Sequence, residues 1–397
     1  MPIQLKLNTF IIFPVLLFWC ESGFTAPFIP ANEAMVLEQL PFRANDPTAR
    51  ELGRLRNELS SDPRNLDKAI ILAQRYYQLA LAEGDPRFIG YAQAALAPWW
   101  GLAEPPVPVL VLRATLRQYN HDFTNALADL AQATRREPRN GAAWALRAAI
   151  HMVQADYAAA RKDCGNLPGL ASELIVLACA TAVDNLNGQA EKSYNSLRQA
   201  YISSVTVSPD EKLWILTRLA EMADRLGRSR EADAYFKAAL ALNIPDAYLL
   251  AVYAEFLLDE NRHREVVELL KGKERSDVLL VRLALAEKAL ALPQAKEHEA
   301  AIRARFDAAR LRDDKLHIQD EARFYLYFLN DSKEALRLAQ ENWQTQREPS
   351  DARMLLEAAL AAKDVAAARP VMTWLAQSRI EDRHLQKLAA AIRELKP

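Results

Sequence analysis

The stretch from His121 to Ala133 reads HDFTNALADLAQA and is followed by Arg-Arg-Glu-Pro138. A similar stretch begins 34 residues later at Ala155 and reads ADYAAA, and another begins at Gly227 and reads GRSREADAYFKAA. Each has the character of a helix that starts after a tight turn, with an aromatic or small residue three positions before a key alanine or small residue and an apolar one four positions after it. Such self-similarity at a fixed period is typical of helical repeat proteins.

The key small residue can be followed along most of the chain, at spacings between 33 and 39 residues. We call this series the second-helix ladder; it consists of Ala92, Ala126, Ala160, Ser193, Ala232, Val266, Ala300, Ala335 and Ala368. The first-helix ladder lies twelve residues earlier and consists of Ala80, Ala114, Ala148, Thr181, Ala220 and Ala254, after which it breaks into Lys288, Arg323 and Leu356. Small residues on two consecutive helices let the two backbones approach closely.

The pattern resembles the tetratricopeptide repeat family, whose unit is a pair of antiparallel helices with a period of about 34 residues. Tyr76 and Trp144 match the large residue of the first helix, and Pro138 matches the proline near the end of a unit. The large apolar position of the second helix is matched by Leu130, Leu197, Phe236 and Leu270. The resemblance covers roughly residues 66–380 and implies an all-α, right-handed α-solenoid of about eight or nine helix pairs.

Composition agrees with an almost wholly helical chain. Only 11 of the 397 residues are glycine, whereas alanine, the best helix former, is abundant. So few glycines argue against barrels, sandwiches and folds with glycine-rich nucleotide loops, which need many positions with positive φ. A net charge of -1 gives no electrostatic reason to expect a nucleic acid as a partner.

The expected organisation has four parts. Residues 1–26 are predicted to be a signal peptide, 27–45 an irregular N-terminal arm, 46–382 the repeat array and 383–397 a C-terminal capping helix. One interval of the array is longer than the others, and its extra residues fall between Tyr201 and Glu211. Ser208, Pro209 and Glu211 there predict a helix start with a capping box.

The N-terminal segment predicts export to the periplasm or out of the cell. Its unbroken apolar run, Phe10 to Cys20, has 11 residues, which suits a signal peptide better than a membrane span of about 20 residues. Retention of the segment as an uncleaved anchor is the alternative. After removal of the signal, no further membrane span is expected.

The usual sequence motifs for catalysis, cofactor binding and metal binding are absent or incomplete. The chain has no glycine-rich phosphate loop and no nucleophile elbow, and His298-Glu299 begins like a zinc-protease helix but Ile302 stands where the second histidine would be. The other histidines show no spacing typical of a metal site. We therefore expect a protein without a catalytic site, cofactor or metal.

Cys164 and Cys179 are the cysteines that remain once the signal is removed. They fall on the second helix of one pair and the first helix of the next, which pack side by side. In an exported protein this favours a structural disulfide, although two buried thiols are the alternative.

Partners of tetratricopeptide arrays bind on the concave face, which the first helices line. By helix phase this partner-binding face includes Tyr77, Gln118, Met152, Asn185, Trp214, Thr217, Glu221, Tyr248 and Glu255. Trp214 and Tyr248 would be its large anchors, and Glu221 and Glu255 would make its middle acidic. The same positions could instead belong to the packing between repeats.

These features predict a non-enzymatic scaffold or adaptor of the cell envelope, which binds a peptide or helix of another protein in its concave groove. Binding of a polysaccharide or another envelope component is the alternative, which more aromatic residues on the groove would favour. An enzyme with an unrecognised site is a third hypothesis.

Overall fold

The computed structural model describes residue 42 and residues 45–395, so the predicted signal peptide and nearly all of the predicted arm lie outside the described residues. The chain divides between Glu51 and Leu52, inside helix α1 (Pro47–Ser60), and every later helix belongs to the unit that begins at Leu52. The described residues form 21 α-helices and no β-sheet.

Most helices pack as antiparallel pairs of neighbours along the chain. The first helices of the pairs are α2 (Leu66–Glu83), α5 (Val107–Tyr119), α7 (Gly141–Val153), α9 (Glu173–Asn185), α11 (Pro209–Arg225), α13 (Ala247–Asp259), α15 (Asp277–Ala289), α17 (Ile318–Tyr327) and α19 (Pro349–Ala362). The second helices are α3 (Arg87–Ala95), α6 (Phe123–Arg136), α8 (Tyr157–Cys164), α10 (Ala190–Ser203), α12 (Ser229–Leu240), α14 (His263–Leu270), α16 (Gln294–Leu311), α18 (Ser332–Thr345) and α20 (Val365–Ser378). The short helix α4 (Ala97–Trp100) follows α3, and the terminal helix α21 (Arg383–Glu394) packs on α19. The predicted all-α solenoid of tetratricopeptide-like helix pairs is confirmed.

The turns inside several pairs share one hydrogen-bond pattern. Between α5 and α6 the amide of Asp122 donates to the carbonyl of Arg117 over 2.9 Å, and between α7 and α8 the amide of Asp156 donates to that of His151 over 2.8 Å. These bonds close a Schellman motif, which needs a residue of positive φ just before the aspartate. The non-glycine residues that adopt positive φ are His121, Ala155, Asn243, Asn261, Ala291, Asp313, Asn330, Lys363 and Arg379. The shortage of glycine is therefore not a shortage of left-handed positions.

The ladders identify the packing residues of the first six helix pairs. Every member of the first-helix ladder from Ala80 to Ala254 is at most 5% exposed. After α14 the ladders hold only in part. Ala335, Leu356 and Ala368 are fully buried, whereas Ala300 is exposed and Lys288 and Arg323 are not the small residues of the core. Ala284 and Ala322 take that place, and both are fully buried.

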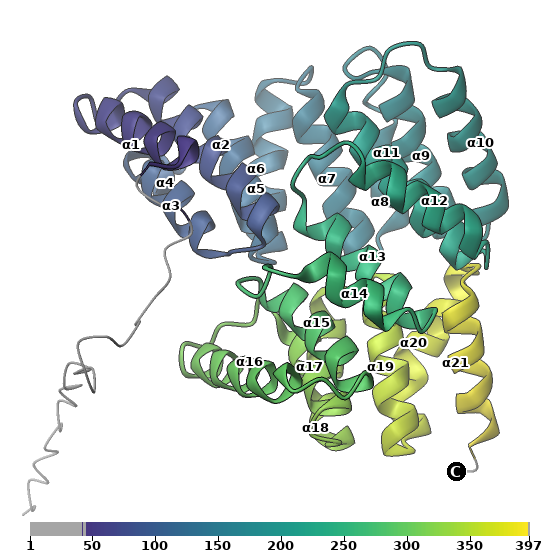
Figure 1. Cartoon of the computed structure of the whole chain (residues 1–397). Coiled ribbons are helices and arrows are strands. Elements are labelled where there is room, and N and C mark those ends of the chain that lie inside the picture. The colour runs from purple at the N-terminus through teal and green to yellow at the C-terminus, as the bar shows by residue number, and fades with distance from the viewer. Residues whose placement is uncertain (1–41, 43–44, 396–397) are drawn as a thin grey trace, which may run out of the picture. The chain divides into compact units, whose positions relative to one another are not determined.

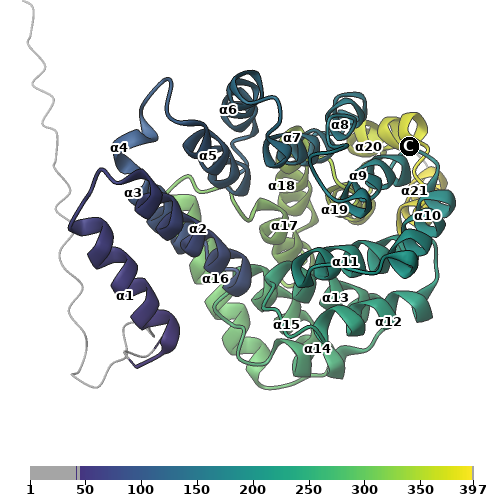
Figure 2. The same ribbon diagram turned by 90° about the horizontal axis from the view of Figure 1, so that it is seen from above.

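The pairs follow one another around a superhelix, in which the first helices form the inner layer (Figure 2). We call α2–α12 the first turn and α13–α21 the second turn. α13 contacts α2, where the path begins to repeat. In Figure 1 the second turn lies below the first, with α17–α20 under α5–α10.

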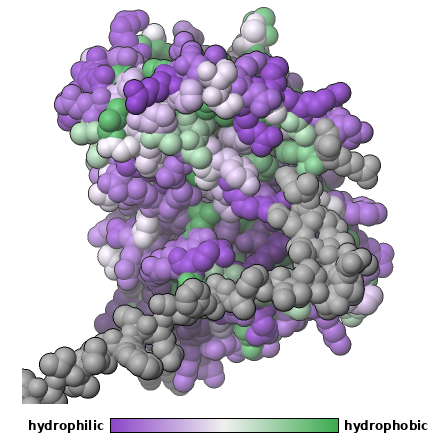
Figure 3. Space-filling view, turned by 90° about the vertical axis from the view of Figure 1, so that its left-hand side faces the viewer, coloured by the Kyte–Doolittle hydropathy of each residue, from purple (hydrophilic) through white to green (hydrophobic). Residues whose placement is uncertain are grey.

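The face shown in Figure 3 is mostly hydrophilic over the described residues, with hydrophobic side chains scattered among the polar ones. Within residues 45–395, no helix combines the length and the apolar character needed to cross a bilayer.

Two local predictions fall in the first turn. Ser208 and Glu211 form a reciprocal capping box at the start of α11, as their spacing indicates. Cys164, at the end of α8, and Cys179, on α9, form a disulfide with Cα atoms 5.7 Å apart. The disulfide joins two consecutive helix pairs.

Candidate functional site

The residues predicted to line the concave face lie on the first helices, but they differ in exposure. Tyr77, Gln118 and Met152 are partly buried. Asn185 and Thr217 are only 1% and 4% exposed, so they belong to the packing rather than to an open surface. Arg225 donates to the Asn185 side chain over 2.7 Å, and the Thr217 hydroxyl donates to the carbonyl of its own helix at Leu213.

Two of the predicted lining residues, on α11 and α13, are exposed. Trp214 is 37% exposed and Tyr248 is 46% exposed. The Arg218 guanidinium lies 4.9 Å from the centre of the Tyr248 ring, and the Tyr248 hydroxyl donates to Glu221 over 2.7 Å. Arg218 also pairs with Glu221 at 3.1 Å. We call Trp214, Arg218, Glu221 and Tyr248 the aromatic site.

The Tyr248 side chain is exposed to solvent, but its hydroxyl lies among protein groups. Burial, which Glu221 and Glu348 reinforce against the opposing charge of Arg218, raises the pKa of the Tyr248 hydroxyl. Tyr77, on α2, behaves similarly, because burial raises its pKa to about 12. These phenols are therefore neutral at physiological pH and act as hydrogen-bond donors and aromatic surfaces.

Glu255 lies in a different environment from the exposed acidic group that the sequence suggested. It pairs with Arg323 at 2.8 Å, with Arg282 at 3.2 Å and with Arg353 at 3.8 Å. Burial alone would raise the pKa of Glu255, but these three guanidinium groups outweigh it and hold the pKa far below the ordinary value. Further bonds of Arg282 to Asp320 and of Arg353 to Asp259 extend this arrangement, which we call the arginine network.

A loop of the second turn approaches the inner face of the first. The amide of Arg347 donates to the carbonyl of Val153 over 2.7 Å, and Gln346 contacts the ring of His121 at 3.2 Å. Glu348 follows in the same loop; burial raises its pKa, and the charge of Arg218 opposes the rise. Burial and the charge of Glu348 raise the pKa of Asp351 to about 7. This loop, residues 346–348, is thus close enough to Arg218 to act on the aromatic site electrostatically.

Hydrogen bonds and ion pairs between the turns, including the two of this loop, form an interface that we call the seam. The pairs are Asp85 with Arg275 (3.4 Å), His121 with Gln346 (3.2 Å), Val153 with Arg347 (2.7 Å), Tyr157 with Trp374 (3.2 Å), Ala190 with Glu381 (2.6 Å) and Asp224 with Arg383 (2.6 Å). Each pair joins an end of a first-turn helix, or the turn beside it, to a residue of the second turn. All six of these contacts are hydrogen bonds or ion pairs.

One group near the seam has the residue types of a metal site. Asp224, Asp259 and His384 place one potential ligand atom each within 4.8 Å of one another. Arg383 already pairs with Asp224 and Arg353 with Asp259, both at 2.6 Å. Because both carboxylates are already neutralised by guanidinium groups, we assign the group to the ion pairs that hold the turns together.

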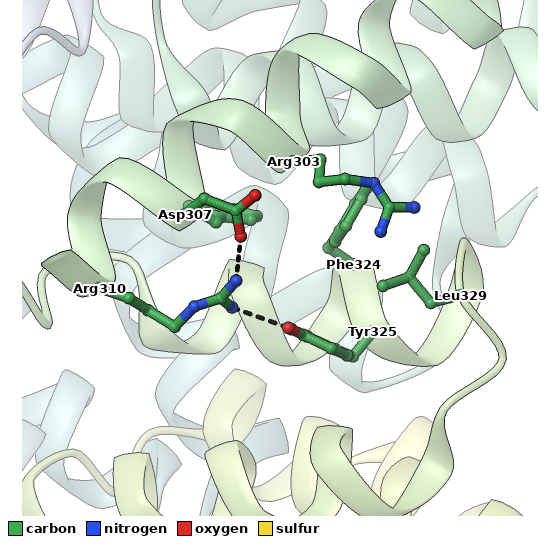
Figure 4. A pocket seen from close by; sticks show the side chains of 7 residues that line it. Arg303, Asp307, Arg310, Phe324, Tyr325 and Leu329 are labelled. Carbon is green, nitrogen blue, oxygen red and sulfur yellow. Dashed lines mark hydrogen bonds and ion pairs between the residues drawn. The ribbon is translucent and has the colours of Figure 1, made fainter.

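A small pocket opens between α16 and α17 (Figure 4). Arg303 lies 5.7 Å from the ring centre of Phe324, and Arg310 binds Asp307 and the Tyr325 hydroxyl. Its cavity volume is about 80 Å³. Ligand pockets usually enclose about 300–1,000 Å³, so this pocket is too small for a substrate of ordinary size.

The sequence predicted Trp214 and Tyr248 as lining residues but not the charged residues around them. Arg218 carries the site's positive charge and was not among the predicted lining residues. Its spacing of four from Trp214 along α11 was the available signal, because such residues share a helix face. Glu348 was not predictable in the same way, since it comes from a pair 130 residues further along the chain.

No family model matches the chain, and no curated protein matches it. Among solved structures, the chain is similar to Naa15/Naa10 bound to HypK-THB, with 15% identity and a TM-score of 0.24, covering 87% of this chain and 63% of that one. It is also similar to the TPR domain of P58(IPK), with 14% identity and a TM-score of 0.22, covering 88% of this chain and 98% of that one. At these scores the likeness is distant.

Proposed function

We propose that the protein is a non-enzymatic scaffold that binds a segment of another protein at the aromatic site. The observation that carries the proposal is the exposure of Trp214 and Tyr248, 37% and 46%, on consecutive first helices of a tightly packed array. Tryptophan, tyrosine and arginine are the residues that most often dominate the binding energy of protein interfaces. Arg218 and Glu221, which contact Tyr248, would fix the orientation of a bound peptide or helix.

The test compares three proteins in affinity capture followed by mass spectrometry. The double variant Trp214→Ala/Tyr248→Ala should lose most of the partner captured by the unchanged chain, because truncation of two anchors typically costs about 2 kcal/mol or more each. Tyr91→Ala is the matched control, since Tyr91 is 53% exposed but lies on α3, a second helix of the array. Equal capture by the double variant and the control would refute the proposal, provided that circular dichroism shows the same helix content.

Binding of a polysaccharide is the second candidate function. Tyr77 and Tyr119 lie on α2 and α5, two first helices of the array, and Tyr77 contributes to the raised pKa of Tyr119, after burial and Asp85. The inner face therefore carries more aromatic side chains than the two anchors. Retention of the unchanged chain on insoluble glycans, abolished in Trp214→Ala/Tyr248→Ala, would favour this candidate over a protein partner.

We further propose that the scaffold acts in the cell envelope after export. The apolar run from Phe10 to Cys20 supports export, and the Cys164–Cys179 disulfide supports an oxidising compartment. Cell fractionation together with N-terminal sequencing of the mature protein tests both points. A protein found in the cytosol that begins at Met1 would contradict the proposal.

A further inference from the structure

Arg225, the last residue of α11, carries a positive charge that has no internal counter-charge. Its guanidinium donates to the side-chain oxygen of Asn185 over 2.7 Å, but no carboxylate within residues 45–395 forms an ion pair with it. The adjacent Asp224 binds Arg383 instead. The Nε atom of Arg225 is buried and has no hydrogen-bond partner. A buried charge is normally paired, because it has lost the solvation that water would give.

Asn185, the last residue of α9, has a second donor of the same kind. Its side chain is 1% exposed, and its oxygen accepts from Arg225, but its Nδ2 atom is buried without an acceptor. Two side chains in direct contact therefore each keep a buried donor unused. Leaving such a donor unsatisfied costs free energy, which an incoming acceptor would recover.

The neighbouring acidic groups leave the charge of Arg225 uncompensated. Glu221 pairs with Arg218 at 3.1 Å and accepts from Tyr248 over 2.7 Å, so it is already used inside the aromatic site. Burial raises the pKa of Glu348, which favours its neutral form, although the charges of Arg218 and Arg225 oppose the rise. The charge on Arg218 is thus balanced by a bonded carboxylate, whereas the charge on Arg225 is not.

Arg225 stands in line with the aromatic site. Trp214, Arg218, Glu221 and Arg225 follow one another along α11 at spacings of four, three and four residues, which places them on one helix face. The seven residues from Arg218 to Arg225 correspond to about 10 Å along the helix axis. A segment that lies along α11 over the aromatic site would therefore reach Arg225 and Asn185 at its other end.

We infer that Arg225 and Asn185 form a carboxylate-binding subsite, which takes an acidic side chain of the protein segment bound at the aromatic site. The inference rests on the proposed function and names the chemistry of its partner. An ionised carboxylate only accepts hydrogen bonds, and it accepts them most strongly from a charged donor such as a guanidinium. The acidic residue should stand about 10 Å from the residue that contacts Tyr248, which is seven residues away in a helix or three in an extended segment.

The experiment selects peptides from a random library displayed on phage, with the full chain as the target. Arg225→Gln removes the charge and keeps a polar side chain of similar shape. Arg337→Gln is the matched control, because Arg337 is an exposed arginine on α18, a second helix, where it pairs with Glu334. Peptides selected by the unchanged chain and by the control should be enriched in aspartate and glutamate at a constant distance from an apolar residue. Peptides selected by Arg225→Gln should lack this enrichment.

The best selected peptide is then compared with a copy in which glutamine replaces the acidic residue. The unchanged chain should bind the copy at least tenfold more weakly, because a charge-assisted hydrogen bond is lost. The same exchange in the peptide should have little effect on binding to Arg225→Gln, as expected when two groups contact each other. An equal loss in both proteins would overturn the inference, because the acidic residue would then bind elsewhere.

A second variant keeps the test decisive if Arg225→Gln fails to fold. Asn185→Asp preserves the shape of the side chain and supplies a carboxylate to Arg225 from within the chain, so it should also abolish the enrichment of acidic residues. Retained enrichment would overturn the inference.

The remaining outcomes separate this inference from the proposed function. Apolar peptides without acidic residues would overturn the subsite and leave the aromatic site as a binding site. The absence of any selected peptide would overturn both. Retention of the unchanged chain on polygalacturonate, lost in Arg225→Gln and without peptide selection, would assign the subsite to an acidic polysaccharide and overturn the protein partner.

Discussion

The inner face over α11 and the start of α13 keeps the aromatic side chains of Trp214 and Tyr248 in contact with solvent, whereas the later part of α13 and the helices α15, α17 and α19 hold the arginine network. Both faces are built from the first helices of tetratricopeptide-like pairs, and both carry a glutamate at the centre. Glu221 pairs with Arg218 and accepts from Tyr248, whereas Glu255 is enclosed by three arginines. The same helix position thus binds one arginine and one tyrosine on α11 and three arginines on α13.

The difference shows how a repeat array can assign separate tasks to its halves. In the first turn, small ladder residues bring the helices together, and the buried ion pair of Arg113 with Asp129 joins the two helices of one pair. In the second turn the ladder is interrupted at Arg323, and the buried guanidinium takes part in holding α13, α15, α17 and α19 together. The open face suits recognition, and the filled face suits rigidity.

The largest effect should come from Glu255→Gln, which leaves three arginines without their shared carboxylate. Breaking a buried ion pair at one partner typically costs about 3–5 kcal/mol. Glu221→Gln, the equivalent change on α11, should cost about 1 kcal/mol, because only one arginine loses its carboxylate and the glutamine can still accept from Tyr248. Urea unfolding of both variants measures the difference, and equal losses would erase the distinction between the two faces.

The second effect concerns the disulfide, which links α8 to α9 in the first turn. Joint replacement of Cys164 and Cys179 by serine should lower the free energy of unfolding by about 3 kcal/mol, the chain-entropy estimate for a 15-residue loop. The loss should appear in the first turn, with faster hydrogen exchange in α8 and α9 than in α19. Titration of two free thiols in the unchanged, oxidised protein after denaturation would contradict the disulfide.

The third effect is a pH dependence that arises from Asp351, in the second turn. The pKa of Asp351 is raised to about 7, so the folded state keeps a proton that the unfolded state loses at lower pH. Stability should therefore fall as pH rises through the range between about 4 and 7, by about 2 kcal/mol between pH 5 and pH 8. Asp351→Asn should flatten this fall in thermal melts. A variant that keeps the full slope would show that another group titrates.

The smallest effect is expected on the open face. Tyr248→Phe removes the hydrogen bond from the hydroxyl to Glu221 but keeps the ring beneath Arg218. Its cost should be about 1 kcal/mol, as for one net hydrogen bond, because Glu221 keeps its ion pair with Arg218. A loss in urea unfolding as large as that of Glu255→Gln would mean that the aromatic site is structural rather than free for a partner.

The helix pairs could be predicted from the sequence because they depend on residues that recur locally. Ala126 and Phe123 specify a helix and its packing face within one turn of chain. The contacts between residues far apart in the chain could not be predicted in this way. Arg323 was visible as a break in the first-helix ladder, but its partner Glu255 lies 68 residues away. The sequence placed Thr217 and Glu255 on the correct helices. It could not show that Thr217 is buried or that three arginines neutralise Glu255, because both depend on tertiary packing.

The seam also bears on how the chain folds. Arrays of this kind usually contain local contacts alone, so that folding can start at any pair and spread to its neighbours. Here Ala190 bonds to Glu381 across 191 residues and His121 contacts Gln346 across 225. Such distant contacts carry a high loop-closure cost until both turns exist. Folding should therefore end with a slow docking step, after the helices of both turns have formed.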